Sequence, residues 1–331
     1  MPNLIPAILI ALSLTAVADD KSRPSLALPI DCTLGKDCFI QQYVDLDPGP
    51  GIKDYRCGTA TYDGHTGMDF RVLSVKAAQA GVKVLASAAG RVKGVRDGVE
   101  DRLMLTEADR QAVKDRECGN GVVLDHGNGW ETQYCHIRRG SVTVLSGQTV
   151  AAGTSLGLVG YSGQAQFAHV HLSVRQNGAV FDPFTGRATK EGFCLGQWVQ
   201  TTSGLWQNEE SMVYADAQII ETGFAPAQVG PAEVEQGGIA PPDAGSPALV
   251  FYARLINMRA GDGLRFKVEG PGGFQVASTG APLDRNQAQY VGIAGKKRSG
   301  EPWPSGDYRG VVEVIRADTV IGTAEKTLQL P

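Results

Sequence analysis

The sequence predicts a mainly β protein: an antiparallel β-sheet domain with a short helical insertion, followed by a C-terminal immunoglobulin-like β-sandwich. Short apolar runs alternate with glycine-rich turns from about residue 32 to residue 184. The one stretch typical of a helix is 101–117, which is rich in Leu, Ala, Glu and Arg. From 248 to 330, short strand-like runs are again separated by turn clusters, which is typical of a sandwich.

The first 18 residues are typical of a secretory signal peptide. Residues 4–17 form a short apolar run, and the Ala-Val-Ala sequence at 16–18 provides a small-x-small cleavage site. No Lys or Arg precedes Lys21, so only the amino terminus charges this segment, and a buried strand is the alternative. We expect cleavage after Ala18 and a periplasmic or secreted location.

The length and charge of the chain limit its function class. Its 331 residues suffice for two domains, which we place at 19–205 and 206–331, with a Pro/Gly-rich loop or linker at 223–247. A net charge of −4 with 7% aromatic residues excludes a basic nucleic-acid footprint. After the N-terminus no apolar stretch reaches about 20 residues, so no transmembrane segment is expected.

The strands of the first domain are predicted from short apolar runs and one turn signal. Residues 68–72, 82–86 and 121–125 have the composition of strands. The Asn-Gly pair within 126–129 is typical of a tight hairpin turn, and 130–137 then forms the returning strand.

The second domain is predicted to begin with a strand within 212–222 and to continue as a set of short antiparallel strands. The further predicted strands are 249–255, 264–269, 308–316 and 319–329. Trp303 and Tyr308 are aromatic candidates for a binding surface, although core packing is the more common role of such residues.

The six cysteines, an even number, agree with export into an oxidising compartment. Cys32 and Cys38 are close enough in sequence to close a small loop. No C-x-x-C pair occurs, which favours disulfides over a zinc-thiolate site. For the other four cysteines the sequence does not determine the pairing, and our prediction is Cys57–Cys118 and Cys135–Cys194.

Four of the five histidines lie in short motifs together with one aspartate. His169 and His171 are two residues apart on a predicted strand, so both imidazoles project from one face while Val170 and Leu172 face the core. Two buried neutral imidazoles need polar partners, which a metal or a reacting water provides. An exposed polar strand face is the alternative, and the spacing does not decide which histidine binds a metal.

His65 and Asp69 are four residues apart. Gly64 and Gly67 argue against a helix, so we expect a loop that leads into the strand at 68–72. Gly67 would let the backbone bend so that the imidazole and the carboxylate reach one point. An isolated H-x-x-x-D match is weak, and this one gains weight only from the motifs downstream.

His136 lies on a predicted strand, where alternation places Cys135 on the opposite face, away from any site. Considered alone, His136 is more often a structural residue than a catalytic one. His126 lies beside the hairpin turn and has no partner motif. We expect it to stabilise the turn, or to contact the site residues without binding the metal itself.

The order H-x-x-x-D, Y-x-H, H-x-H resembles that of the lysostaphin-like (LytM-type) zinc metallopeptidases, which are peptidoglycan endopeptidases. Matching stretches occur at 64–70, 121–129 and 181–184, and the resemblance spans about 62–184. It implies that the predicted domain at 19–205 is a LytM-type metallopeptidase domain.

The resemblance also implies roles for the site residues. One Zn²⁺ would be bound by His65, Asp69 and His171, with His136 and His169 as the catalytic pair. Three protein ligands leave an open fourth position, which is typical of a catalytic zinc site. A histidine would take the proton of a water, and the pair would steady the oxyanion and protonate the leaving amine.

The implied function is a secreted zinc metalloendopeptidase that hydrolyses peptide cross-links of peptidoglycan, with the peptide stems as its partner. The C-terminal domain could bind a protein or wall polymer. The alternatives are a non-catalytic activator of cell-wall hydrolases, a wall-binding protein, and a secreted protease of protein substrates. Two departures from the family pattern bear on substrate access: the long loop between Val95 and Gly119, whose residues 101–117 could act as a lid, and Ala168, where proline is frequent.

Overall fold

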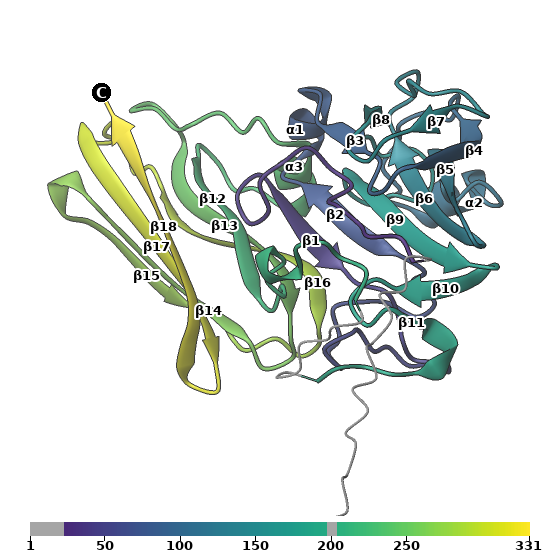
Figure 1. Cartoon of the computed structure of the whole chain (residues 1–331). Helices are drawn as coiled ribbons and strands as arrows, with labels where there is room; N and C mark the ends of the chain where they lie inside the picture. Colours follow the sequence, from purple (N-terminus) through teal and green to yellow (C-terminus); the bar gives the residue numbers. More distant parts are fainter. Residues whose placement is uncertain (1–22, 197–203) are drawn as a thin grey trace, which may run out of the picture.

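The computed structural model describes residues 23–196 and 204–331 (Figure 1). The predicted signal peptide, residues 1–18, lies outside the described residues. The described part is mainly β, as the sequence predicts. Within it, no helix is both long enough and apolar enough to cross a membrane.

An antiparallel sheet forms the N-terminal half, on the right of Figure 1. Its strands follow the order β1-β2-β9-β6-β5-β4-β7, and β10 and β11 extend the sheet from β9. The bounds are β1 Cys38–Gln42, β2 Met68–Val72, β4 Gly90–Arg96, β5 Asn120–Gly127, β6 Trp130–Ile137, β7 Thr149–Val150, β9 His169–Gln176, β10 Ala179–Asp182 and β11 Arg187–Ala188. A separate pair is formed by β3 (Lys83–Leu85) and β8 (Ser155–Leu158). The predicted strands 68–72 and 130–137 are β2 and β6, and β5 and β6 form the predicted hairpin.

Strand alternation separates the core of this sheet from its functional face. Val170 and Leu172 on β9 are fully buried in the hydrophobic core, as predicted, together with Phe70 on β2 and Tyr134 on β6. The residues between them on β9 point to the other face of the sheet. The apolar positions of β9 therefore fix which of its side chains remain for chemistry.

Two short helices belong to the N-terminal half. Helix α1 (Val75–Gln79) begins at Ser74, whose side chain accepts a hydrogen bond from the backbone of Ala77. Helix α2 (Glu107–Ala112) has a capping box made by Thr106 and Asp109. It forms only six residues of the predicted insertion at 101–117.

The C-terminal part is a β-sandwich, on the left of Figure 1. One sheet has the order β12-β13-β16 and the other β15-β14-β17-β18. The bounds are β12 Gln218–Ala225, β13 Ala248–Met258, β14 Gly263–Gly270, β15 Phe274–Thr279, β16 Gln287–Lys297, β17 Gly306–Arg316 and β18 Thr319–Leu330. Phe251 of one sheet and Phe266 and Val312 of the other belong to one buried core. Tyr308 lies in this core and Trp303 packs against it, so both aromatic candidates are core residues.

The segment 223–247, predicted as a loop or linker, includes the end of β12 and a helix, α3 (Pro231–Gln236). The same proline and glycine residues that suggested a linker mark the ends of this helix. Pro231 occupies its first turn, and Gly237 follows its last residue with a positive φ of 74°. The first strand of the sandwich also begins later than predicted, at Gln218 rather than 212. The predicted domain boundary at 205/206 stays a prediction.

Three disulfides join the six cysteines. Cys32–Cys38 is confirmed. The predicted pairs Cys57–Cys118 and Cys135–Cys194 are wrong, because Cys118 pairs with Cys135 and Cys57 with Cys194. The β5–β6 hairpin is the physical reason: it brings Cys118, just before β5, next to Cys135 on β6, with 4.8 Å between the two Cα atoms.

A buried ionic cluster joins the sandwich to the large sheet. Arg71 on β2 and Arg254 on β13 both donate to Oε2 of Glu235 on α3, over 2.7 and 2.6 Å. All three side chains are almost completely buried. Because a buried charge is costly without its partner, the cluster favours one arrangement of the two parts.

Three short 3-10 helices complete the described elements. They cover Thr189–Glu191, Glu209–Ser211 and Pro271–Gly273.

Candidate metal centre

The pairing of β2 with β9 brings the predicted metal ligands together. Asp69 and His171 are register partners, and Asp69 Oδ1 lies 2.8 Å from His171 Nδ1. His65, from the loop before β2, places Nε2 at 3.3 Å from Asp69 Oδ1 and 3.2 Å from His171 Nδ1. One donor atom from each residue therefore lies within 4.8 Å of the other two.

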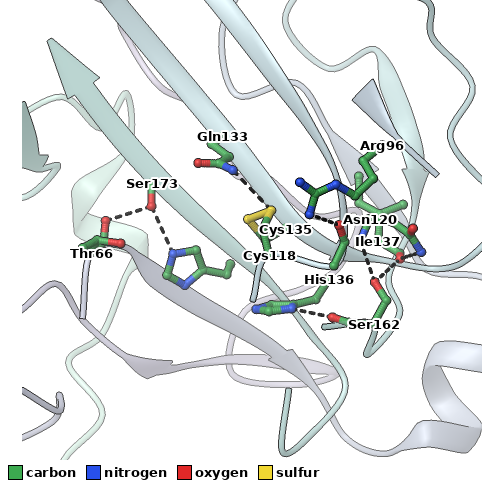
Figure 2. Close-up of a disulfide and its surroundings, with 12 residues drawn as sticks. Thr66, Arg96, Cys118, Asn120, Gln133, Cys135, His136, Ile137, Ser162 and Ser173 are labelled. Atoms are coloured by element: carbon green, nitrogen blue, oxygen red, sulfur yellow. Dashed lines mark hydrogen bonds between the residues drawn. A yellow bond between two sulfur atoms is a disulfide. The ribbon is translucent and has the colours of Figure 1, made fainter. Parts of the chain in front are cut away.

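The remaining nitrogen of each of these imidazoles has a fixed acceptor. His65 Nδ1 lies 2.7 Å from the carbonyl oxygen of Tyr43, which can only accept, so Nδ1 carries the hydrogen. His171 Nε2 lies 3.0 Å from Ser173 Oγ, whose own hydroxyl donates to the carbonyl of Thr66 over 2.8 Å. Figure 2 shows this link between Ser173 and Thr66. The serine oxygen is thus left to accept the Nε2 hydrogen of His171.

These tautomers make the centre a set of acceptors. His65 Nε2 and His171 Nδ1 present lone pairs to each other and to the carboxylate of Asp69. Three acceptors that converge in a buried place repel one another unless a cation lies among them. Two imidazoles and one carboxylate are ligands that suit Zn²⁺, so the donor set fits the expected metal.

The two other motif histidines lie beside this centre. His169, on β9 with His171, has Nε2 at 3.5 Å from Asp69 Oδ1, and its Nδ1 donates to the carbonyl of Phe167 over 2.8 Å. His136 donates from Nδ1 to the carbonyl of Ser162 over 2.7 Å. The ring centroids of His136 and His169 are 4.5 Å apart. Both Nε2 atoms therefore carry a lone pair and can accept a proton.

Burial sets the charge state of these groups. It lowers the pKa of His136 well below its usual range, and the neighbouring His169 and His171 lower it further. Burial likewise lowers the pKa of His169 and of His171, against the opposing effect of Asp69. For Asp69, burial alone would raise the pKa, but the surrounding imidazoles outweigh it and hold that pKa well below the ordinary value. Asp69 is thus ionised beside the neutral imidazoles of His136, His169 and His171.

His136 has an unusual backbone conformation, which the neighbouring disulfide supports. Its φ is +63°, a region that residues other than glycine rarely adopt. Its backbone N–H donates to the carbonyl of Cys118 over 2.9 Å, and Figure 2 shows the Cys118–Cys135 disulfide next to it. The prediction that Cys135 points away from the site is wrong, because Cys135 and His136 line the same cleft. The positive φ interrupts the strand alternation on which that prediction depended.

Gly67 is required for a reason other than the predicted one. Its φ is not positive, so it supplies no special bend. A Cβ at this position would lie 2.5 Å from His171 Nε2 and 2.6 Å from the carbonyl oxygen of Leu172. Only glycine lets the loop pass this close to a metal-ligand candidate.

His126 stands apart from the centre, as expected. Its Nδ1 donates to the carbonyl of Ala89 over 2.7 Å, and its Nε2 lies 2.8 Å from Thr132 Oγ1. These contacts brace the end of the β5–β6 hairpin against the chain before β4.

A cleft of about 490 Å³ opens onto the centre, and a second hollow of about 300 Å³ adjoins it. Tyr62, His136 and His171 line both. Met104 and Arg110 of the insertion line the larger cleft without closing it. The insertion therefore forms a wall of the cleft.

Several residues that hold the site were missed in the sequence. Tyr43, Phe167 and Ser162 act through backbone carbonyls, which leave no signal in residue type. Ser173 could have been found, since it follows His171 by two positions and must therefore face the same side of β9.

The antiparallel sheet carries this histidine–aspartate centre in an open cleft, an arrangement that could hold a metal ion. Residues 63–183 match the model of Peptidase family M23. The matched stretch is the one that carries the motifs, and it agrees with the family that they predict.

Several solved structures are partly similar to this chain. The catalytic domain of the prophage-encoded M23 protein EnpA from Enterococcus faecalis is 21% identical, with a TM-score of 0.31 over 49% of this chain and 95% of that chain. The catalytic domain of lysostaphin from Staphylococcus simulans is 22% identical, with a TM-score of 0.27 over 37% and 77%. A zinc-containing peptidase from Vibrio cholerae is 22% identical, with a TM-score of 0.28 over 44% and 39%. The match of residues 63–183 to the family model does not depend on these partial similarities.

Proposed function

We propose that this protein is a secreted zinc metalloendopeptidase that hydrolyses peptide cross-links of peptidoglycan. The observation that carries the proposal is the convergence of three acceptors, from His65, Asp69 and His171, beside two neutral histidines with free Nε2 atoms. A regulator that had lost catalysis would not need such a complete set. The match to the model of peptidase family M23 supports the class of substrate.

In this proposal His65, Asp69 and His171 hold one Zn²⁺ per chain. The ion would acidify a water molecule and polarise the carbonyl of the scissile peptide bond. The hydrogen bonds to Tyr43 and Ser173 orient the two imidazole ligands, and the ionised Asp69 balances the positive charge.

His136 and His169 perform the proton transfers. Each is held by an Nδ1–H hydrogen bond to a backbone carbonyl, so Nε2 is the reacting nitrogen. Because burial lowers the pKa of both, each is neutral near pH 7 and can accept a proton from the attacking water. Once protonated, the same nitrogen can stabilise the developing oxyanion and deliver the proton to the leaving amine.

Export is also part of the proposal. The apolar segment at 4–17 precedes the expected cleavage after Ala18, and three disulfides suit an oxidising compartment such as the periplasm or the cell exterior. Peptidoglycan is accessible there. A secreted protease of protein substrates would use the same chemistry and is the second candidate.

The test is hydrolysis of purified sacculi, compared with casein, by the zinc-loaded mature chain. Release of peptides from sacculi, loss of release in His136→Ala, and retained zinc in that variant are the expected results. His171→Ala should lose both zinc and activity. If the zinc-loaded wild-type chain cleaves neither sacculi nor casein, catalysis is refuted. Casein cleavage without release from sacculi would favour the second candidate.

A further inference from the structure

The cleft beside the candidate centre is lined by both parts of the protein. Asp69, His136 and His169 of the large sheet line it together with 287–289 at the beginning of β16 in the sandwich. The sandwich therefore forms part of the wall of the cleft in which a substrate would lie.

Strand β16 borders the cleft with its edge. It is the last strand of the order β12-β13-β16 and, within the described residues, pairs only with β13. Successive strand residues point to opposite faces, so a cleft lined by the three consecutive residues 287–289 meets the edge of the strand. Strand β1, at the edge of the large sheet, contributes the consecutive residues Gln41 and Gln42. Strand edges of this kind are where extended peptides bind.

The lining of the cleft is rich in side-chain amides. Arg71 Nη1 donates to Oε1 of Gln41 over 2.6 Å and to Oε1 of Gln289 over 3.0 Å, and so links β1 to β16. The other lining glutamines have no side-chain hydrogen bond within the described residues: Gln42, Gln164, Gln166 and Gln287.

These free amides indicate the chemistry of a ligand. A carboxamide offers both a donor and an acceptor, which match the C=O and N–H groups of a peptide main chain. Outside the centre, Arg110 is the one charged residue among the described residues that line this cleft. The wall is therefore suited to an uncharged, extended main chain.

We propose that Gln42 and Gln287 form a subsite for the main chain of the extended peptide substrate, so that the sandwich takes a direct part in substrate binding. The subsite lies in the cleft of the candidate centre and rests on the proposed function. Gln42 follows Gln41, and Gln287 lies two positions before Gln289, so the Arg71 link joins the two strand segments that carry these free amides.

The test measures binding separately from turnover. Zinc-loaded His136→Ala, expected to be inactive, is titrated with purified cross-linked muropeptide dimers, alone and combined with Gln287→Ala or Gln42→Ala. Loss of one hydrogen bond should weaken binding about two- to tenfold for each. Gln329→Ala is the matched control, since Gln329 is exposed on β18 and does not line the cleft.

Equal affinity of the Gln287→Ala and Gln329→Ala proteins, or no binding of the dimers to the parent, would overturn the subsite. Gln287 is only half-buried, so its variant keeps the test valid even where Gln42→Ala fails to fold. If the wild-type chain binds but does not cleave the dimers, the proposed function fails, while the comparison of affinities still decides the subsite.

Discussion

The carboxylate of Glu235 accepts a hydrogen bond from the backbone N–H of Ala168, with 3.3 Å between Oε1 and N. Ala168 immediately precedes His169, so a residue of helix α3 holds the segment that carries a proposed proton-transfer group. Proline, which is frequent at this position in the family that the motifs resemble, could not donate this bond. The departure from that pattern thus coincides with a contact from the C-terminal half.

Replacing Glu235 by Gln should impair turnover more than substrate binding. The change leaves the guanidinium groups of Arg71 and Arg254 without their buried counter-charge, which should cost about 3 kcal/mol of unfolding free energy. The single amide oxygen of Gln cannot accept from both the arginines and the Ala168 N–H. If the arginines take it, the backbone before His169 is loosened, so we expect kcat to fall about 10- to 100-fold with KM and zinc content little changed. Steady-state kinetics, zinc analysis and denaturant unfolding check this.

Glu221→Gln is the control for the Glu235 variant. Glu221 Oε2 lies 3.8 Å from Arg254 Nη1, and Glu221 makes no contact with Ala168. Its variant should weaken the same cluster but keep kcat. An equal loss of kcat in both variants would show that Glu235 acts only through stability.

Ser173→Ala should weaken zinc binding. Without the Ser173 hydroxyl, no acceptor fixes the tautomer of His171 that directs the Nδ1 lone pair to the centre. Loss of such a supporting hydrogen bond typically costs 10- to 100-fold in metal affinity, roughly the range expected here. Competition with a zinc-sensitive chelator measures it. Ser87→Ala is the control, because Ser87 is equally buried but its Oγ makes no hydrogen bond within the part of the chain that the structure describes. Unchanged affinity in Ser173→Ala would contradict the role.

Removing the Cys118–Cys135 disulfide should reduce activity as well as stability. The Cys118 carbonyl accepts the backbone N–H of His136, which adopts its positive φ beside this bridge. A double Cys→Ser change should cost about 3 kcal/mol for a loop of this size and lower kcat. The Cys32–Cys38 disulfide closes a shorter loop away from the histidines. Its removal by the same double change should therefore cost less stability and leave kcat unchanged. Thermal unfolding and kinetics of both variants decide the matter.

The pKa of His136 predicts how activity depends on pH. Burial lowers this pKa, so the proton-accepting neutral form persists below the ordinary histidine value of about 6.5. Activity should therefore be retained into mildly acidic solution and fall only as the pH drops through the lowered pKa. NMR titration of the His136 ring should show the same shift. A midpoint at or above 6.5 would contradict the burial argument.

Much of the candidate centre could be predicted from local sequence. The two-residue spacing of His169 and His171 determines that both face one side of a strand, and the apolar residues between them show which side is the core. Partners that act through a backbone carbonyl, such as Ser162, could not be predicted, because any residue supplies the same group.

The errors lie where distant segments meet. The disulfide pairing depends on the register of the β5–β6 hairpin, which composition does not show. Helix α3 lay within a segment rich in Pro and Gly, and its Glu235 was not singled out because its partners, Arg71 and Arg254, are far away in sequence. Strand β16, whose Gln287 lines the cleft, was not predicted either.

The buried cluster of Arg71, Glu235 and Arg254 also bears on how the protein can be divided. Truncation after the large sheet would strip Arg71 of its counter-charge and expose the edge strand β1 to solvent. We therefore expect the two halves to unfold as one cooperative unit, in a single calorimetric transition. The C-terminal half could therefore not be attached to another large sheet unless that sheet also carried an arginine for Glu235 to neutralise.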